Sequence, residues 1–355
     1  MSIGIILGTR PEIIKLSPVI RRCAEQDIDF TLIHSGQHYS EDLSSNFFEL
    51  LDLPRPDYNL EVGSGRQGQQ SGEMIKRIES TLLEVQPKTV LVQGDTNTTM
   101  AGAVATSKLD PKLGHVEAGL RSYDWAMPEE INRKIVDHIS DMLFAPTEDT
   151  IETLLGEGIS EDRIYYTGNT IVDAVQQNKS IANTKSDILS ILDIKPGKYL
   201  LFTVHRQENV DDPEVLLQIL EGASRVGRMT NVPVIYPIHP RTADVIETHE
   251  LPIPPEIELI DPVGFLDFLQ LEDDAMLTLT DSGGVQEESC ILQTPCVTIR
   301  DTTERPETVD IGANILAGTK PEQIQDAAAE MLRTKSDWKN PFGDGTAAKK
   351  ILDAI

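Results

Sequence analysis

Short apolar runs alternate along the chain with longer segments in which apolar residues recur every three or four positions. The runs are typical of strands buried on both faces, and the longer segments are typical of amphipathic helices. In the first half of the chain, buried strands are predicted at residues 3–7, 30–33, 90–93, 114–116, 143–145 and 164–167, with helices between them such as 71–85 and 129–139. Strands that alternate with helices form a parallel sheet covered on both faces, so this half is expected to be a doubly wound α/β domain.

The same alternation starts again after a polar stretch around residues 176–195. Strands are predicted there at residues 200–204, 232–236, 257–260, 275–280 and 296–299, and helices at 213–225, 265–271, 285–292 and 321–333. At 355 residues the chain exceeds the size at which a single core usually keeps growing. The predicted fold class is therefore α/β, with two doubly wound, Rossmann-like domains.

The composition excludes several kinds of partner and site. The formal net charge is −27, from 31 lysines and arginines against 58 aspartates and glutamates, which disfavours non-specific binding to nucleic acid or to an anionic membrane. The N-terminus has no basic leader, and no apolar span is long enough to cross a membrane, so a cytoplasmic protein is expected. The three cysteines, Cys23, Cys290 and Cys296, match no zinc spacing, so we expect neither disulfides nor a metal cluster.

The excess of acidic residues is dispersed along the chain rather than collected in a tail. Such a surface is typical of a protein adapted to a cytosol of high salt, because salt screens the repulsion between like charges. We therefore predict that the melting temperature rises when KCl is increased from low to molar concentration. A melting temperature that does not change over this range would contradict the prediction.

The most informative motif is the segment Thr280-Asp-Ser-Gly-Gly-Val-Gln-Glu-Glu-Ser289, which lies between two apolar runs. It is expected to form a glycine turn that opens a helix, where the first N–H groups and the positive end of the helix dipole suit a phosphate. Gly283 and Gly284 let a ligand approach the backbone, and Glu288 is placed to accept hydrogen bonds from ribose hydroxyls. These features indicate a nucleotide. The alternative is a tight strand-to-helix turn with Ser282 as its N-cap.

Polar residues also follow the other predicted strands, at the edge of the sheet where doubly wound domains bind ligands. They include Arg10 and Lys15 after the first strand, Asp95 and Glu117 after the third and fourth, and His205 and His239 in the second half. Together with Glu129, the two carboxylates provide groups suited to general acid–base chemistry. Structural roles remain open for most of them. Arg10 and Lys15 could lie on a solvated helical turn, and Asp95 could be an N-cap. Glu129 and Glu130 could complement a helix dipole, and His205 could be a structural histidine at a strand end with its hydrogen bonds made within the protein.

Taken in order, the motifs resemble one known family. They are Gly8-Thr-Arg-Pro-Glu-Ile-Ile-Lys15, Gln93-Gly-Asp-Thr96, Gly114-His-Val-Glu-Ala-Gly-Leu-Arg-Ser122, Pro128-Glu-Glu-Ile-Asn-Arg133, Gly168-Asn-Thr170, His205-Arg206, Asp281-Ser-Gly-Gly-Val-Gln-Glu-Glu288 and Arg300-Asp-Thr-Thr-Glu-Arg-Pro-Glu307. The set spans nearly the whole chain and is similar to that of the non-hydrolysing UDP-N-acetylglucosamine 2-epimerases. The resemblance implies a fold of the glycosyltransferase B type with the ligand in the interdomain cleft. It also implies a first domain of residues 1–172 joined by a C-terminal helix within 340–355, and a UDP-binding second domain of residues 173–339.

The chemistry that the resemblance implies is the interconversion of UDP-N-acetylglucosamine and UDP-N-acetylmannosamine. Members of the family eliminate UDP to give 2-acetamidoglucal and add it back, need no metal or redox cofactor, and are usually homodimers. Their catalytic residues match Asp95, Glu117, Glu129 and His205. Their substrate-binding residues match Arg10, Lys15, Asp95, Glu117, His205, Val263, Phe268, Ser282, Gly283, Gly284, Glu288 and Arg305, and at Val263 only the backbone can serve. Partial candidates for a regulatory site that holds a second substrate molecule are Gln37, His38, Arg66 and His239.

Three other functions remain open. A hydrolysing 2-epimerase would use the same residues but release N-acetylmannosamine and UDP. A glycosyltransferase of the same fold would pass the sugar to an acceptor, and a non-catalytic sensor would bind the nucleotide sugar without needing the carboxylates. A transferase needs one base at most, so the three carboxylates Asp95, Glu117 and Glu129 argue against it. The sequence leaves open which carboxylate is base and which is acid, and which glycan pathway uses the product.

Overall fold

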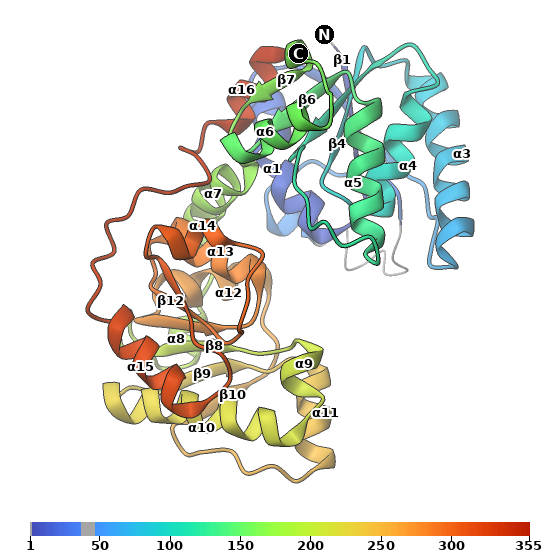
Figure 1. The fold of residues 1–355 in the computed structure, drawn as a ribbon. Helices are drawn as coiled ribbons and strands as arrows, with labels where there is room; N and C mark the ends of the chain where they lie inside the picture. Colours follow the sequence, from blue (N-terminus) through green and yellow to red (C-terminus); the bar gives the residue numbers. More distant parts are fainter. Residues whose placement is uncertain (1, 37–46) are drawn as a thin grey trace. The chain divides into compact units, whose positions relative to one another are not determined.

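The computed structural model of the chain describes residues 2–36 and 47–355. Its internal contacts divide it into two compact units (Figure 1). Unit 1 consists of Met1–Ala174 and Phe342–Ile355, and unit 2 consists of Val175–Pro341. Each unit contains a sheet of parallel strands covered by helices, so the predicted α/β class with two doubly wound domains is confirmed.

Among the described residues, unit 1 has a seven-stranded sheet with the order β3-β2-β1-β4-β5-β6-β7. The strands are β1 (Ser2–Leu7), β2 (Asp29–His34), β3 (Tyr58–Asn59), β4 (Thr89–Gln93), β5 (Lys112–Val116), β6 (Met142–Ala145) and β7 (Ile164–Tyr166). The chain adds β2 and β3 on one side of β1 and then returns to its other side, so that Ile5 pairs with both Leu32 and Leu91. The strand order therefore reverses between β1 and β4, which is where doubly wound sheets bind ligands at the carboxyl ends of their strands.

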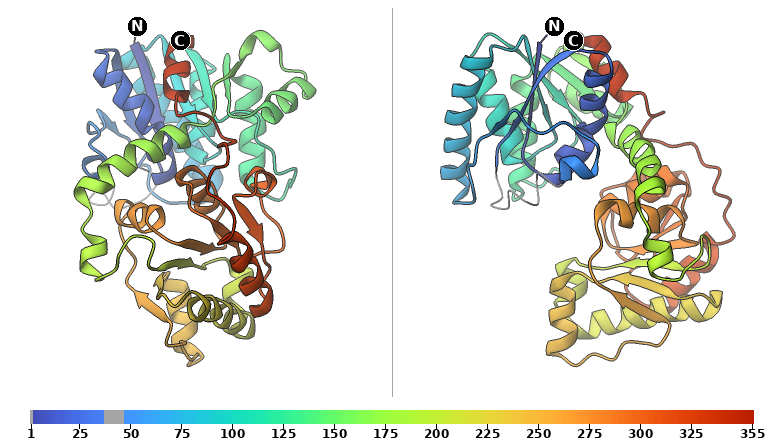
Figure 2. Two further views of the ribbon diagram at one scale, coloured as in Figure 1. Left: turned by 90° about the vertical axis from the view of Figure 1, so that its left-hand side faces the viewer. Right: turned by 180° about the vertical axis from the view of Figure 1, so that it is seen from behind.

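Helices cover both faces of the sheet in unit 1 (Figures 1 and 2). They include α1 (Arg10–Glu25), α3 (Gln67–Val85), α4 (Asn97–Thr106), α5 (Pro128–Ile139), α6 (Glu148–Gly156), the 3-10 turn η1 (Glu161–Arg163), the first part of α7 (Thr170–Lys185) and α16 (Ala347–Ala354). Helices α3, α4 and α5 lie on one face, and α1 lies with the C-terminal α16 on the other. Asp173 fixes the start of α16, because its carboxylate accepts the N–H groups of Ala347 (3.1 Å) and Ala348 (3.0 Å).

Unit 2 has a six-stranded parallel sheet with the order β10-β9-β8-β11-β12-β13. Its strands are β8 (Leu200–Thr203), β9 (Val234–Pro237), β10 (Ile257–Ile260), β11 (Leu277–Thr280), β12 (Cys296–Thr298) and β13 (Asn314–Leu316). Its helices are α8 (Ile188–Ile191), α9 (Gln207–Val210), α10 (Pro213–Thr230), α11 (Pro240–Thr248), α12 (Phe265–Asp273), α13 (Gly283–Leu292), α14 (Pro306–Asp310) and α15 (Pro321–Met331). Here the strand order reverses between β8 and β11, so the loops after these two strands are the expected ligand-binding position.

The structure adds two strands, and helices such as α7 and α8, to the elements that the sequence pattern predicts. Strands β3 and β13 lie at edges of their sheets and are only two and three residues long. The polar stretch around residues 176–195 is mostly helical, since α7 continues to Lys185 and α8 follows. Its polar residues lie on α7 beside buried small and apolar side chains such as Ala174, Val175 and Ala182.

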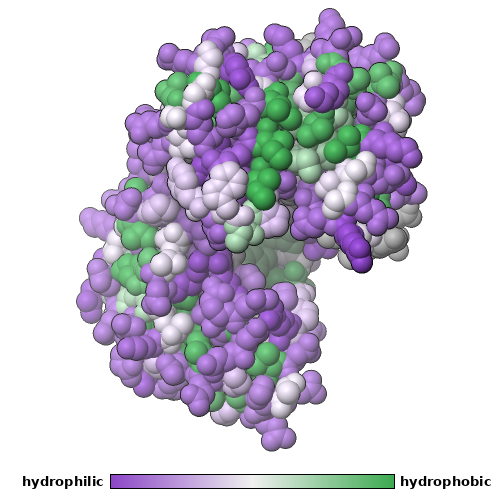
Figure 3. Space-filling view, turned by 45° about the vertical axis from the view of Figure 1, so that its right-hand side comes forward, coloured by the Kyte–Doolittle hydropathy of each residue, from purple (hydrophilic) through white to green (hydrophobic). Residues whose placement is uncertain are grey.

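The described residues contain no helix that is long and apolar enough to cross a membrane. The surface seen in Figure 3 is largely hydrophilic on both units, with apolar side chains in smaller groups. All three cysteines are buried and unpaired, and burial raises the pKa of the Cys23 thiol to about 11. They are therefore packing residues rather than reactive thiols.

Candidate functional site

In unit 1, the carboxylate of Glu12 binds the backbone of the loop between β1 and α1. Glu12 is buried and accepts the N–H groups of Gly8 (2.9 Å) and Thr9 (2.7 Å), together with the hydroxyls of Thr96 (2.6 Å) and Thr99 (3.0 Å). Burial raises the pKa of Glu12 despite these hydrogen bonds. The N–H groups that hold a phosphate in many doubly wound domains are thus already used, and Glu12 instead joins the loop of Arg10 to the loop of Asp95.

Two of the predicted carboxylates, Asp95 and Glu117, follow the neighbouring strands β4 and β5. Both oxygens of Glu117 accept hydrogen bonds from the Lys15 ammonium, at 2.7 and 2.6 Å, and one also accepts from Gln93. Asp95 is held by the guanidinium of Arg133, whose Nε lies 2.9 Å from Oδ2. The structure therefore brings Lys15 and Glu117 into contact, and it gives Asp95 and Glu117 each a fixed cationic partner.

Glu117 has a backbone conformation that side-chain-bearing residues rarely adopt. Its φ is +71°, and the nearby Gly94 and Gly119 also have positive φ values of +74° and +87°. Such a conformation costs of order 1–3 kcal/mol and persists only where the surroundings fix it, most often at functional sites. The turn after β5 therefore aims the Glu117 carboxylate at the expense of backbone strain.

A buried pair beneath these turns, His115 and Asp137, holds them in place. The ring of His115 contacts the Asp137 carboxylate through Nδ1 (2.7 Å) and the Gly94 carbonyl through Nε2 (2.8 Å). Asp137 also accepts the Gly119 N–H (3.2 Å) and pairs with Arg121 at 2.7 Å. Burial raises the pKa of Asp137, but His115 and Arg121 outweigh burial and bring it below its ordinary value. The sequence pattern predicts no role for this pair, although a histidine within an otherwise apolar strand is a signal of a buried polar contact.

The two adjacent glutamates at the start of α5 have different roles. Glu130 is fully buried and accepts hydrogen bonds from the Ser122 N–H (2.8 Å) and from Arg133 (3.2 Å). Burial raises the pKa of Glu130, but these hydrogen bonds lower it below its ordinary value overall. Glu130 thus fastens the loop before α5, whereas Glu129 is half-exposed in the first helical turn. Of the two, Glu129 is the one available to a ligand.

In unit 2, the turn Ser282-Gly283-Gly284 opens α13 directly after β11. Ser282 is the N-cap by position, but its side chain makes no capping hydrogen bond. Neither glycine has a positive φ, and a Cβ added to Gly283 or Gly284 would meet nothing closer than 3.7 and 3.9 Å respectively. The fold itself does not require glycine at either position. The missing side chains instead leave space beside the first turn of α13.

His205 follows β8, on the neighbouring strand, and its ring is oriented by Asp281. Its Nδ1 lies 3.2 Å from Oδ1 of Asp281, and its side chain is 42% exposed. Asp281 is buried and also accepts the N–H groups of His205 (3.1 Å) and Arg206 (2.9 Å). Burial raises the pKa of Asp281, but the hydrogen bonds from His205 and Arg206 bring it below its ordinary value. Asp281 therefore fixes both the loop and the ring, leaving Nε2 for a ligand.

The other predicted ligand contacts of unit 2 lie on the helices and loops that follow its strands. Val263 and Phe268 pack against an apolar cluster that includes Leu201 and Leu271. The N–H of Phe268 donates to the Gly264 carbonyl (2.9 Å) inside α12, so this group is already used by the helix. Arg305 pairs with Glu287 at 2.8 Å. Glu288 lies half-buried on α13, and in unit 1 the exposed Arg10 lies 5.6 Å from the centre of the Phe47 ring.

Two of the four regulatory candidates lie in the described part of the chain, one in each unit. Gln37 and His38 lie outside the described residues. Arg66 is exposed at the N-cap of α3 in unit 1. His239 is the N-cap of α11 in unit 2, and its ring centre lies 5.9 Å from that of His205. His239 is thus a neighbour of the candidate nucleotide site within unit 2.

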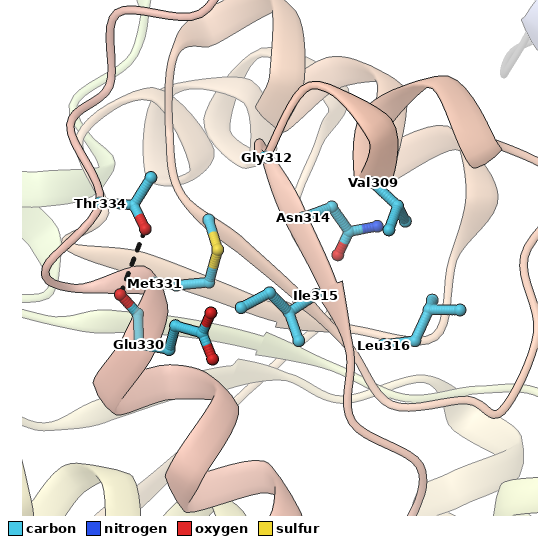
Figure 4. A pocket seen from close by; sticks show the side chains of 8 residues that line it. All are labelled: Val309, Gly312, Asn314, Ile315, Leu316, Glu330, Met331 and Thr334. Atoms are coloured by element: carbon cyan, nitrogen blue, oxygen red, sulfur yellow. Dashed lines mark hydrogen bonds between the residues drawn. The ribbon is translucent and has the colours of Figure 1, made fainter.

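A pocket of about 440 Å³ lies elsewhere in unit 2, between β13, α14 and α15 (Figure 4). Val309, Ile315 and Met331 supply much of its apolar lining, and the Thr334 hydroxyl donates to the Glu330 carbonyl (3.2 Å). Its lining residues include no lysine, arginine or histidine. Nothing in it is suited to a diphosphate, so the candidate site remains at the strand ends.

Comparison with known proteins places these residues in a family context. A sequence model described as UDP-N-acetylglucosamine 2-epimerase matches residues 21–355. A protein of that name from Methanococcus maripaludis is 51% identical over 364 residues, covering 99% of this chain and 98% of the relative. The structure of UDP-GlcNAc 2-epimerase from Methanocaldococcus jannaschii superimposes with a TM-score of 0.92 at 49% identity, covering 100% of this chain and 99% of that chain. A structure of the M. jannaschii enzyme in complex with UDP-GlcNAc and UDP matches with a TM-score of 0.84 at 51% identity and the same coverage.

Proposed function

The chain belongs to the UDP-N-acetylglucosamine 2-epimerase family, and on this premise we propose that it interconverts UDP-N-acetylglucosamine and UDP-N-acetylmannosamine without hydrolysis. In the proposed reaction a base removes the proton from C2 of the sugar, and the C1–O bond breaks with its electron pair leaving on UDP. The product of this step is 2-acetamidoglucal, with a double bond between C1 and C2. An acid then returns a proton to the opposite face of C2, and UDP adds back to C1.

The observation that carries the proposal is the pair of carboxylates on neighbouring strands of unit 1, each with its own cation. Asp95 is paired with Arg133 and Glu117 with Lys15, and Glu117 is held at a strained φ of +71°. A reaction that removes a proton on one face and returns it on the other needs two positioned acid–base groups. Asp95, Glu117 and Glu129 supply candidates for both roles.

Unit 2 supplies the groups that the proposal needs for UDP. The first turn of α13 at Gly283 and Gly284 suits the diphosphate, and Glu288 on the same helix is the proposed acceptor for the ribose hydroxyls. Cations and hydrogen-bond donors stabilise the negative charge that develops on a departing diphosphate. His205 and Arg305 of unit 2, together with Arg10 of unit 1, are the residues proposed for this role.

The second candidate function is hydrolysis, in which water adds to the same glucal intermediate and free N-acetylmannosamine and UDP are released. The same carboxylates and the same UDP site would serve both reactions. The difference lies in whether water reaches the intermediate before UDP returns to C1. The two functions can therefore be distinguished by their products.

The proposal predicts that incubation with UDP-N-acetylglucosamine in deuterated water places deuterium at C2 of both UDP-linked epimers. The reason is that a proton removed from C2 exchanges with solvent before another is returned. Proton NMR of the mixture follows the loss of the C2 proton signal and the appearance of the second epimer. Epimers that keep a fully protonated C2 would contradict the route, and accumulation of free N-acetylmannosamine with UDP would identify the hydrolysing enzyme.

A further inference from the structure

Two arginines of unit 2 bind the same carboxylate beside the candidate diphosphate site. Arg300 donates to both oxygens of Glu304, at 2.7 and 2.9 Å, and Arg206 approaches both oxygens at 3.2 and 3.4 Å. Both guanidinium groups thus use two nitrogens toward one anion. The side chains of Arg300 and Arg206 are 10% and 29% exposed, while that of Glu304 is 50% exposed. The carboxylate therefore covers two arginines that are otherwise largely shielded from water.

The Glu304 carboxylate lies at the start of α13. Oε2 of Glu304 is 3.7 Å from the position that a Cβ on Gly283 would occupy. Arg206 follows His205 at the end of β8, and its N–H is fixed by Asp281. The loop that carries Glu304 is tied back to α13, because the Thr303 hydroxyl donates to Gln286 and also accepts the N–H of Arg305 (3.0 Å). The internal anion is therefore held where the proposed function places the diphosphate.

A carboxylate and a diphosphate attract the same partners and repel each other. The hydrogen bonds from Arg300 lower the pKa of Glu304 to about 2, so the carboxylate is negatively charged at neutral pH. A phosphate within hydrogen-bonding reach of the Gly283 N–H would lie a few ångströms from that charge, where repulsion is substantial. Guanidinium forks bind phosphate as readily as carboxylate. The two anions consequently compete for one set of cations.

We propose that Arg206 and Arg300 are diphosphate-binding residues, and that Glu304 occupies them as an internal anion until the nucleotide displaces it. The inference rests on the proposed function, because it takes UDP to bind at the turn of Gly283. Glu304 then lowers the affinity for UDP. A surface ion pair with no role in binding would leave that affinity unchanged.

The test is to titrate UDP, inorganic diphosphate and uridine into the full chain and into the variant Glu304→Gln by calorimetry. The variant should bind UDP and diphosphate about tenfold more tightly, as expected when a competing charged hydrogen-bond acceptor is removed, while uridine affinity stays the same. Glu322→Gln is the matched control. Glu322 is also an exposed carboxylate of unit 2 paired with an arginine, Arg225, at 2.7 Å, so its removal changes the net charge equally. The control should bind all three compounds like the unaltered chain.

A second comparison tests whether Glu304 acts through the arginines. In the background Arg206→Gln, the change Glu304→Gln should tighten UDP binding by less than about threefold, because one of the two freed forks is missing. If the unaltered chain binds UDP but Glu304→Gln binds it equally or more weakly, the inference is overturned while the proposed function stands. If the unaltered chain does not bind UDP, the proposed function and the inference are both wrong.

Discussion

Replacing Glu117 by glutamine is expected to reduce turnover of UDP-N-acetylglucosamine by about 10²-fold or more, as for a positioned acid–base group. Glutamine keeps the size of the side chain but can neither take up nor release the proton. UDP affinity should stay within a few-fold, because the proposed UDP contacts at Gly283, Gly284 and Glu288 belong to unit 2. The measurements are the turnover rate by proton NMR and UDP binding by calorimetry.

The variant also changes the environment of Lys15, whose ammonium contacts both oxygens of Glu117 and whose side chain is only 16% exposed. A shielded charge without its partner destabilises the fold by about 1–3 kcal/mol, so turnover must be measured well below the melting temperature. Glu84→Gln is the matched control, since Glu84 is a carboxylate of unit 1 whose hydrogen bond within the described residues comes from an exposed tyrosine hydroxyl, that of Tyr58 at 2.9 Å. Turnover close to that of this control would remove Glu117 from the mechanism. Asp95→Asn and Glu129→Gln are expected to behave like Glu117→Gln.

The strands of the two sheets could be predicted because central parallel strands are buried on both faces and read as continuous apolar runs. Thr89–Gln93 and Leu200–Thr203 are such strands, with every residue buried. The edge strands Tyr58–Asn59 and Asn314–Leu316 are too short to give an apolar run, and they are only partly buried. These two segments become strands because they pair with a neighbouring strand, and the local sequence pattern holds no information about that pairing.

The candidate site could be predicted as a set of residues but not as a set of contacts. Side chains that follow the strands of a parallel sheet converge on the same edge of that sheet, so Asp95 and Glu117 of unit 1 and His205 of unit 2 could be named as candidates from the chain alone. Their partners are set by tertiary packing. Lys15 and Glu117 are 102 residues apart in sequence. The carboxylate of Asp281 was visible in the glycine motif, but its contact with His205 depends on β8 and β11 lying side by side.

Adding a side chain at Gly284 is expected to weaken UDP binding with alanine and to abolish it with valine, while the fold stays intact. Binding and folding can be changed separately here because the fold does not require glycine at this position. Its φ is not positive, and an added Cβ would meet no atom closer than the Ser282 hydroxyl at 3.9 Å. Glycine is also a poor helix residue, so Gly284→Ala should leave stability unchanged or raise it by at most about 1 kcal/mol. Any loss of UDP affinity then means that the added side chain occupies the space of the ligand, and not that the fold is damaged.

The loss should grow with the size of the side chain. Gly284→Ala places one carbon where the diphosphate approaches the N–H groups of α13, and Gly284→Val adds two more in a stiff, branched arrangement. Gly72→Val is the matched control, because Gly72 lies in α3 of unit 1 and a Cβ there would meet nothing within 4 Å. Calorimetric titration of UDP and thermal melting of the three variants decide the question. If Gly284→Val binds UDP like the control, the turn is only a connection between β11 and α13, and the nucleotide binds elsewhere.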